Sequence, residues 1–276
     1  MKNNDIFCVE TITSKTNLTI VKIAKLLDKK YRKEESLFIC SGVKLLEEAF
    51  KFNARIKYVI VNNDVTFEEK VIEIIKKIQG SKASILCVSE SVFLKLTDEK
   101  APQGIVFVCE YFSEKHNFST IVKNCNSNEK VLVLESLRDP GNLGTIIRNA
   151  AAFGVDRLVL SSDCADIYSP KVVRAAMGAV FKLKIDVVSD LKSTLVGMKD
   201  VGYNLLGAAL EKDSLLLGEY SLKSNDAVII GNEGHGISSA VLELCDNTLL
   251  IPMCDNTESL NAAMAATIIM WELYKI

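Results

Sequence analysis

The sequence predicts an α/β protein whose C-terminal part is built on a parallel sheet. Short apolar segments alternate with segments of helical periodicity along the 276 residues. In the second half, the apolar segments lack an alternation of polar and apolar residues, as is typical of strands covered on both faces of a parallel sheet. The composition, with 49% hydrophobic residues, 14 glycines and 4 prolines, excludes disordered and fibrous proteins.

The first part of the chain contains the elements of one smaller α/β domain, predicted to span residues 1–112. It opens with helical periodicity over residues 18–33, which carry basic side chains on one face. Strands are predicted at 37–40, 56–61, 84–89 and 104–111, and helices at 43–51, 67–79 and 90–98. The polar stretch 113–130 is the predicted linker to a second domain, 131–276.

The second domain repeats the alternation more regularly. Its strands are predicted at 131–137, 157–162, 182–188, 203–210, 226–232 and 247–253. Its helices are predicted at 145–154, 170–180, 190–199, 238–245 and 261–275. Ligands of such sheets bind in the loops outside the carboxyl ends of the strands, so these loops are where we look for a site.

Several classes of protein are excluded by the residues that carry metal, redox or membrane chemistry. The eight cysteines have irregular spacing and lie mostly in apolar runs, and the two histidines are His116 and His235. We therefore expect buried reduced thiols, no disulfide framework and no metal site. No apolar run approaches the roughly 18–20 residues of a membrane span, and the N-terminus lacks a secretory signal. We expect a cytoplasmic protein.

The charge is unevenly distributed. The formal net charge is −2, but the first 130 residues are basic and the remainder is acidic. A basic run precedes the first predicted strand: Lys22, Lys25, Lys29, Lys30, Arg32 and Lys33. We interpret this run as a contact for RNA phosphates, with a plain solvated helix face as the alternative.

The first loop with notable polar residues is 135–154. Asp139 begins a turn with the proline and glycine that follow it, and Asn142 is placed to cap a helix that contains Arg148. Taken alone, this pattern also fits an ordinary turn from strand to helix, with Arg148 on a solvated face.

Two further loops have unusual compositions. In residues 228–238, glycines at 231, 234 and 236 surround Glu233 and permit close approach of a ligand to the backbone. Their spacing differs from the dinucleotide-binding G-x-G-x-x-G, which argues against a nicotinamide-dependent oxidoreductase. In residues 251–272, Ser259 and Asn261 stand at the start of the last helix, where an N-cap role is the alternative to a functional one.

Together, the three loops resemble the motifs of the SpoU (TrmH-like) RNA 2′-O-ribose methyltransferases of the SPOUT class. The resemblance rests on Asn142 with Arg148, on GNEGHG at 231–236 and on IPM…ESLNAA at 251–263, and it covers 131–276. The segment LFICSGVKLLEEAF resembles the ribosomal-protein-like RNA-binding domain often fused in front of such enzymes. The resemblance implies a trefoil knot in the catalytic domain, a homodimer and an RNA substrate.

The resemblance also implies which residues form the site. S-adenosyl-L-methionine (AdoMet) is expected at Gly231, Asn232, Gly234, Ile251, Met253 and Leu260. The catalytic residues implied are Arg148, Asn142, Glu233, Ser259 and Asn261. Because the pKa of an arginine is above about 12, Arg148 is interpreted as a phosphate contact that stabilises the developing alkoxide rather than as a base. Glu233 is expected to orient Arg148 or to accept charge.

The two-domain form favours 23S ribosomal RNA as the substrate, with transfer RNA as the alternative. A non-catalytic RNA-binding protein that retains the fold is the rival from another class. Retention of all five polar residues at the motif positions argues against that rival, because RNA binding alone does not require them.

Overall fold

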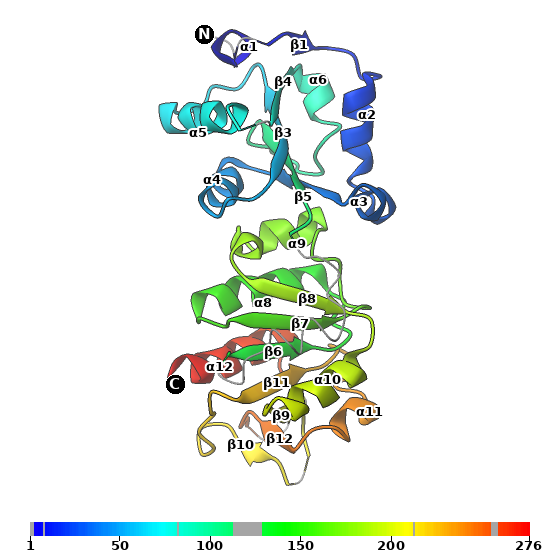
Figure 1. The fold of residues 1–276 in the computed structure, drawn as a ribbon, viewed down its shortest axis with the longest axis vertical. Helices are drawn as coiled ribbons and strands as arrows, with labels where there is room; N and C mark the ends of the chain where they lie inside the picture. Colours follow the sequence, from blue (N-terminus) through cyan, green and yellow to red (C-terminus); the bar gives the residue numbers. More distant parts are fainter. Residues whose placement is uncertain (1–2, 8, 82, 113–128, 212, 255–258) are drawn as a thin grey trace. The chain divides into compact units, whose positions relative to one another are not determined.

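The computed structural model describes residues 3–7, 9–81, 83–112, 129–211, 213–254 and 259–276, and it forms two compact units. The first unit comprises Met1–Phe112 and Asp166–Phe181, and the second comprises Ser113–Ala165 and Lys182–Ile276. The predicted linker lies outside the described residues except for Glu129 and Lys130. Each unit contains its own sheet (Figure 1).

The first unit contains a five-stranded sheet in the order β1-β4-β3-β5-β2. Its strands are β1 (Thr11–Ile12), β2 (Leu37–Ser41), β3 (Ile56–Asn62), β4 (Ser84–Val88) and β5 (Ile105–Glu110). Strand β5 runs antiparallel to β2 and β3, and the other pairings are parallel. The four strands predicted in this part of the chain are confirmed, and β1 is an addition that its two residues were too short to reveal.

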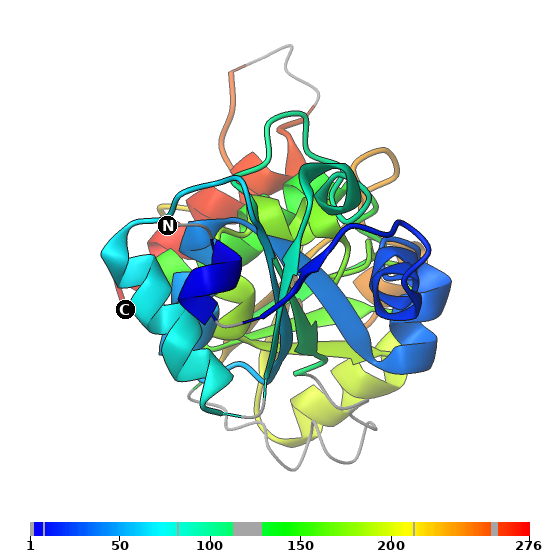
Figure 2. The same cartoon turned by 90° about the horizontal axis from the view of Figure 1, so that it is seen from above.

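Helices cover both faces of this sheet. The helices of this unit are α1 (Asn3–Phe7), α2 (Leu18–Lys25), α3 (Lys29–Glu35), α4 (Val43–Lys51), α5 (Glu69–Gln79), α6 (Glu90–Phe93), α9 (Pro170–Ala175) and the 3₁₀ turn η1 (Ala179–Phe181). Helices α4 and α5 lie on one side of the sheet, and α2, α3 and α6 lie on the other (Figures 1 and 2). The side chains of α2 and α6 share one buried apolar cluster with the strands.

The helical periodicity of residues 18–33 belongs to two helices. Asp28 ends the continuity because its Oδ1 accepts a hydrogen bond from the Lys30 amide at 2.7 Å and caps α3. The Arg32 guanidinium is buried and donates to the carbonyl oxygens of Leu26 and Leu27, and it forms an ion pair with Asp166 at 2.7 Å. The prediction that Arg32 contacts RNA phosphates is therefore wrong: this arginine stabilises the end of α2.

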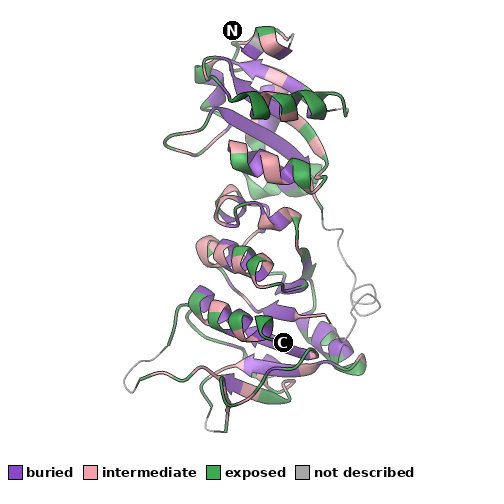
Figure 3. Cartoon of the chain, turned by 90° about the vertical axis from the view of Figure 1, so that its left-hand side faces the viewer, coloured by how far each residue is buried: buried purple, intermediate pink, exposed green. Residues whose placement is uncertain are grey.

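The second unit contains a seven-stranded sheet in the order β10-β12-β9-β11-β6-β7-β8. Its strands are β6 (Val131–Leu134), β7 (Arg157–Ser161), β8 (Lys184–Val188), β9 (Asn204–Ala208), β10 (Leu215–Leu216), β11 (Asp226–Ile230) and β12 (Asn247–Leu250). Every pairing between them is parallel. The central strands are buried on both faces (Figure 3), so the predicted parallel sheet is confirmed.

Helices cover both faces of the second sheet as well. They are α8 (Pro140–Ala152), α10 (Leu191–Asp200), α11 (Ser239–Leu242) and α12 (Ala262–Tyr274). Helices α8 and α12 pack against each other on one face, and α10 and α11 lie on the other (Figure 1). The residue that caps α8 is Asp139 rather than Asn142, because Pro140 fits the first helical position and starts the helix earlier than predicted.

Buried charged residues gather at the amino ends of the strands of the second sheet. Arg157, at the start of β7, forms ion pairs with Glu129 and with Asp186 of β8, whose side chain is only 3% exposed. At the start of β11, the buried Asp226 accepts hydrogen bonds from Asn204 at 2.7 Å and from the Tyr220 hydroxyl at 3.0 Å. These partners satisfy charges that would otherwise be costly to bury.

The cysteines largely follow the prediction of buried reduced thiols. Those described are free, and they are Cys40, Cys87, Cys109 and Cys164 (buried), Cys245 (half-buried) and Cys254 (exposed). The prediction is wrong for Cys254, which belongs to the loop after β12 rather than to an apolar strand. Across the described ranges, no helix combines the length and the apolar character needed to cross a membrane.

Replacing Arg157 with alanine is expected to lower the free energy of unfolding by about 3–5 kcal/mol, because the buried Asp186 would lose its ion pair with the guanidinium. Urea unfolding followed by circular dichroism measures this change. Lys184→Ala is the matched control: its ammonium also pairs with Glu129 but is largely exposed, so a loss below about 1 kcal/mol is expected. Equal losses in the two variants would contradict a special role for the buried pair.

Candidate functional site

The three loops singled out in the sequence follow β6, β11 and β12, at the carboxyl edge of the second sheet. Strands β6 and β11 are direct neighbours, and β12 is separated from β11 only by β9. The loops therefore start close together although they are far apart in the sequence. This is the edge at which parallel α/β sheets bind ligands.

The loop after β11 is a tight turn that its glycines make possible. Asn232 and Gly236 exchange two backbone hydrogen bonds of 2.9 Å, and Gly236 has a φ of +68°. A Cβ at Gly231 would lie 2.2 Å from the carbonyl carbon of Gly236, so no other residue fits there. The Asn232 Oδ1 accepts hydrogen bonds from the amides of Gly234 at 2.9 Å and His235 at 3.2 Å, which holds the turn from inside.

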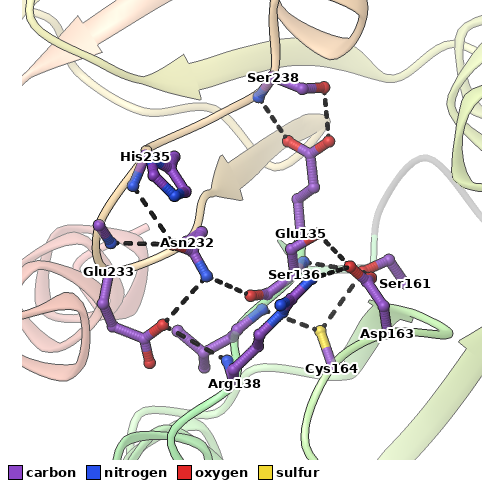
Figure 4. A network of polar contacts seen from close by, with 12 residues as sticks. Glu135, Ser136, Arg138, Ser161, Asp163, Cys164, Asn232, Glu233, His235 and Ser238 are labelled. Carbon is purple, nitrogen blue, oxygen red and sulfur yellow. Dashed lines mark hydrogen bonds and ion pairs between the residues drawn. The ribbon is translucent and has the colours of Figure 1, made fainter.

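Glu233 ties this turn to the loop after β6 (Figure 4). Its Oε1 accepts hydrogen bonds from the Asp139 amide at 3.2 Å and the Asn142 side chain at 3.1 Å, and its Oε2 accepts one from the Arg138 amide at 3.4 Å. Partial burial raises the pKa of Glu233, but the hydrogen bonds from Asn142 and the backbone amides outweigh it and lower the pKa below its ordinary value. Glu233 is therefore an ionised link between two loops.

Asn142 extends this link to the third loop. Its Nδ2 donates to Glu233, and its Oδ1 accepts a hydrogen bond of 3.1 Å from the Asn261 side chain. Asn261 also caps α12, since its Oδ1 accepts from the amides of Ala263 and Met264. The N-cap alternative for Asn261 is thus confirmed, and the same side chain connects the loops. One continuous set of hydrogen bonds, Glu233–Asn142–Asn261, joins all three motifs.

A cavity of about 370 Å³ opens beside these loops. Its walls include the six residues predicted to hold a cofactor, Gly231, Asn232, Gly234, Ile251, Met253 and Leu260, together with Glu233 and Ser259. Backbone groups of the glycine turn form one wall and apolar side chains form another, a combination typical of sites for small organic ligands. Among the residues described, no cluster of three or more His, Cys, Asp or Glu side chains is arranged to hold a metal ion.

Comparisons with known proteins cover both parts of the chain. Residues 129–271 match the SpoU rRNA Methylase family, and residues 17–106 match the MRM3-like substrate binding domain. The chain belongs to the SpoU rRNA methylase family. The resemblance seen in its motifs is confirmed, and with it the expectation of a methyltransferase.

Relatives of this SpoU methylase match it over nearly their whole length. The 23S rRNA (guanosine(2553)-2′-O)-methyltransferase RlmP of Bacillus subtilis is 32% identical over 96% of this chain and 99% of its own. The 23S rRNA (guanosine-2′-O-)-methyltransferase RlmB of Coxiella burnetii is 29% identical over 79% of this chain and 86% of its own. The crystal structure of an AdoMet-bound rRNA methyltransferase from Sinorhizobium meliloti superimposes with a TM-score of 0.85 and 26% identity, covering 96% of this chain and 97% of that one.

Arg148 stands apart from the other predicted catalytic residues of the SpoU site. It lies on an exposed position of α8, and its guanidinium forms no hydrogen bond or ion pair with any residue that the structure describes. Glu233 makes its contacts to Arg138, Asp139 and Asn142 instead of orienting Arg148. The arginine is therefore available for a group from outside the chain, whereas Glu233, Asn142 and Asn261 are engaged with one another.

Sequence reasoning missed the residues that shape the loop after β6. Ser136 has a left-handed backbone with a φ of +54°, and its hydroxyl donates to Asp163. The Ser161 hydroxyl donates to the same carboxylate at 2.6 Å and accepts from the Ser136 amide at 2.8 Å. These hydrogen bonds lower the pKa of Asp163. Glu135, which precedes this turn, was also missed, although an acidic residue directly after an apolar strand is a signal that could have indicated it.

Glu233→Gln is expected to lower the melting temperature at pH 7 by a small amount, because an amide is a poorer acceptor for three donors than a carboxylate. Since the folded pKa lies below 4.5, the wild-type advantage is present above that value and is lost as the pH falls through the folded pKa. The difference between the two proteins should therefore shrink below pH 4.5. Thermal unfolding at pH 7 and pH 4 measures it.

The matched control is Glu243→Gln in α11's C-terminal turn, an exposed glutamate of the same unit. Its difference from the wild type should not change between the two pH values. A difference for Glu233→Gln that is equally large at both pH values would contradict the role of an ionised link.

Proposed function

We propose that this protein transfers a methyl group from AdoMet to a ribose 2′-hydroxyl of structured RNA, and that its substrate is 23S ribosomal RNA in the cytoplasm. The observation that carries the proposal is the hydrogen-bonded set Glu233–Asn142–Asn261 beside a cavity lined by the six expected cofactor residues. The names of the two relatives, both of which specify 23S rRNA and 2′-O-methylation, support the choice of substrate.

The cavity fits AdoMet by the chemistry of its walls. The turn from Gly231 to Gly236 presents backbone groups without side chains, which suits a polar nucleoside edge, and Ile251, Met253 and Leu260 offer apolar surface for an adenine. When bound, AdoMet supplies an electrophilic methyl group on a sulfonium. The trefoil knot implied by the family stays a prediction, because part of the segment concerned, 255–258, lies outside the described residues.

The residues of this chain divide the remaining work. Methyl transfer needs the ribose oxygen held roughly 3–3.5 Å from the methyl carbon and in line with the bond that breaks, and the proton of the hydroxyl passes to solvent water. Arg148 is exposed and unpaired within the described residues, so it can bind the phosphate beside the target ribose and stabilise the oxygen as negative charge develops. Glu233, Asn142 and Asn261 hold the loops in register, and Ser259 contributes a hydroxyl to the cavity wall.

The first unit is proposed to bind the RNA. The family match over 17–106 is to a substrate-binding domain, and it covers the basic run of the sequence. The lysines of that run are all exposed: Lys22, Lys25, Lys29, Lys30 and Lys33. We assign residues 1–112 to RNA binding, 113–130 to the linker and 131–276 to methyl transfer.

The protein is also proposed to act as a homodimer through α12. Met270 is fully buried within the chain, but Met264, Ile268 and Trp271 are 54%, 38% and 47% exposed. Their spacing places these three side chains in one stripe along the helix. A second copy of the chain would cover this stripe. Analytical ultracentrifugation at micromolar concentration tests for the dimer.

The proposed reaction is tested by incubating the protein with labelled AdoMet and RNA that lacks native modifications, with ribosomal and transfer RNA in separate reactions. Label is expected in 23S RNA and should be recovered as a 2′-O-methyl nucleoside. Label only in transfer RNA would overturn the substrate assignment. RNA binding without AdoMet binding or methyl transfer would favour a non-catalytic protein.

Arg148→Ala is expected to keep its affinity for AdoMet and to lose about 10²–10³-fold in methyl transfer, because it removes charge stabilisation at the reacting oxygen. Calorimetry measures the affinity, and a single-turnover assay measures the transfer rate. Lys192→Ala, which removes an exposed cation on α10, should change neither quantity. A parallel loss of AdoMet affinity and transfer in Arg148→Ala would make this arginine a structural residue.

A further inference from the structure

Glu135 contacts both ends of the loop that forms one wall of the cavity. Its backbone amide donates a hydrogen bond of 2.8 Å to the carbonyl of Ile230, the last residue before the loop. Its side-chain carboxylate accepts two hydrogen bonds from Ser238, the first residue after the loop: one from the amide at 2.9 Å and one from the hydroxyl at 2.6 Å (Figure 4). A single buried residue thus holds the loop closed.

We propose that Glu135 and Ser238 together are positioning residues for AdoMet, because they fix the glycine turn in the orientation that binds the cofactor. This inference rests on the proposed function, since it concerns the same cavity. Neither residue belongs to the set that the motifs predicted.

The geometry of Ser238 indicates that it serves the loop rather than the helix. It occupies the N-cap position of α11, where a serine side chain ordinarily accepts a hydrogen bond from the backbone of the first turn. Here it makes no such bond and donates its hydroxyl to Glu135 instead. The usual stabilisation of the helix start is replaced by a contact to a strand that is about one hundred residues away in the sequence.

The turn itself is internally rigid, so its orientation depends on its attachments. The backbone pair between Asn232 and Gly236 and the side chain of Asn232 fix its shape. Glu233 attaches its tip to the loop after β6, and Glu135 attaches its two ends to β6 itself. Without the contact between Ser238 and Glu135, the rigid turn could rotate about its remaining attachments. The orientation of this wall of the cavity would then change, although every residue that lines the cavity would still be present.

The test compares Ser238→Ala, Ser238→Thr and Glu135→Gln with the wild type and with Ser239→Ala, an exposed neighbouring serine without a side-chain hydrogen bond to any described residue. Calorimetry with AdoMet alone measures the affinity. Ser238→Ala is expected to weaken binding about fivefold, the effect of losing one hydrogen bond. Ser238→Thr keeps the hydroxyl and should bind as the wild type does.

Two further measurements separate positioning from a general loss of stability. At saturating AdoMet, the kcat of Ser238→Ala should stay within about twofold of the wild type, so that the effect appears in KM. Without AdoMet, hydrogen exchange at the amides of residues 135 and 238, which attach the two ends of the turn, should be faster in Ser238→Ala and in Glu135→Gln than in the Ser239→Ala control. The variant with both changes should exchange no faster than whichever single variant exchanges faster, because both changes break the same contact.

Wild-type binding of AdoMet with unchanged affinity in Ser238→Ala and Glu135→Gln would overturn this inference and leave the proposed function intact. Equal weakening in Ser238→Ala and Ser238→Thr would also overturn it, since the hydroxyl would then be irrelevant. Absence of AdoMet binding by the wild type would overturn the proposed function itself, and the exchange rates would still decide whether Glu135 closes the loop.

Discussion

The parallel pairing of β6 with β11 is the constraint on which the rest of the site depends. It places the carboxyl ends of β6 and β11 side by side. Side chains of the loop after β11 can therefore form hydrogen bonds with backbone groups of the loop after β6. The Glu135 amide extends the backbone hydrogen bonds between β6 and β11 by one residue. Beyond Glu135, the two loops are joined by hydrogen bonds of polar side chains. Glu233 then reaches from the second loop to the amides of the first. The site thus continues the sheet beyond the ends of its strands, with side-chain carboxyl oxygens instead of backbone carbonyl oxygens as the acceptors for backbone amides.

This arrangement explains why so many polar residues of the site are engaged with one another. A loop at a sheet edge has backbone donors without ladder partners, and an ionised carboxylate satisfies several of them at once. Glu233 does so for two amides at the start of α8. The Glu135 side chain accepts from one amide, that of Ser238, at the start of α11. The consequence for function is a division of labour. Residues that fix the loops are engaged in hydrogen bonds with one another, while the Arg148 guanidinium is exposed and makes no such contact with a described residue.

The sequence predicted the fold well where the signal was local. Buried strands such as β7 and β11 appear as continuous apolar runs, and parallel packing follows from them. The sequence-based prediction was wrong about helix boundaries that depend on one capping side chain. Asp28 divides one helical pattern into two helices, and Asp139 rather than Asn142 begins α8. Both aspartates are helix N-caps. Other residues nearby are of types that also cap helices, so the residue type alone does not identify the cap.

For the site, the sequence indicated which residues gather but not how they are connected. The motif residues were identified by the resemblance of the three loops to the SpoU family, whereas the contact between Glu135 and Ser238 joins residues 103 positions apart and has no local signature. Arg32 illustrates the opposite error. In the sequence it is one cation in a basic run, and only the fold shows that its guanidinium is consumed by two carbonyl oxygens and Asp166.

The ion pairs of Arg157 start from the amino end of β7, at the edge of the sheet opposite the cavity. The buried ion pairs and the candidate site therefore lie at opposite edges of the same sheet, separated by the length of its strands. An enzyme built in this way can adapt to a new temperature and to a new substrate by independent sets of substitutions. Substitutions at the amino edge would change the stability of the fold, and substitutions at the carboxyl edge would change the substrate specificity.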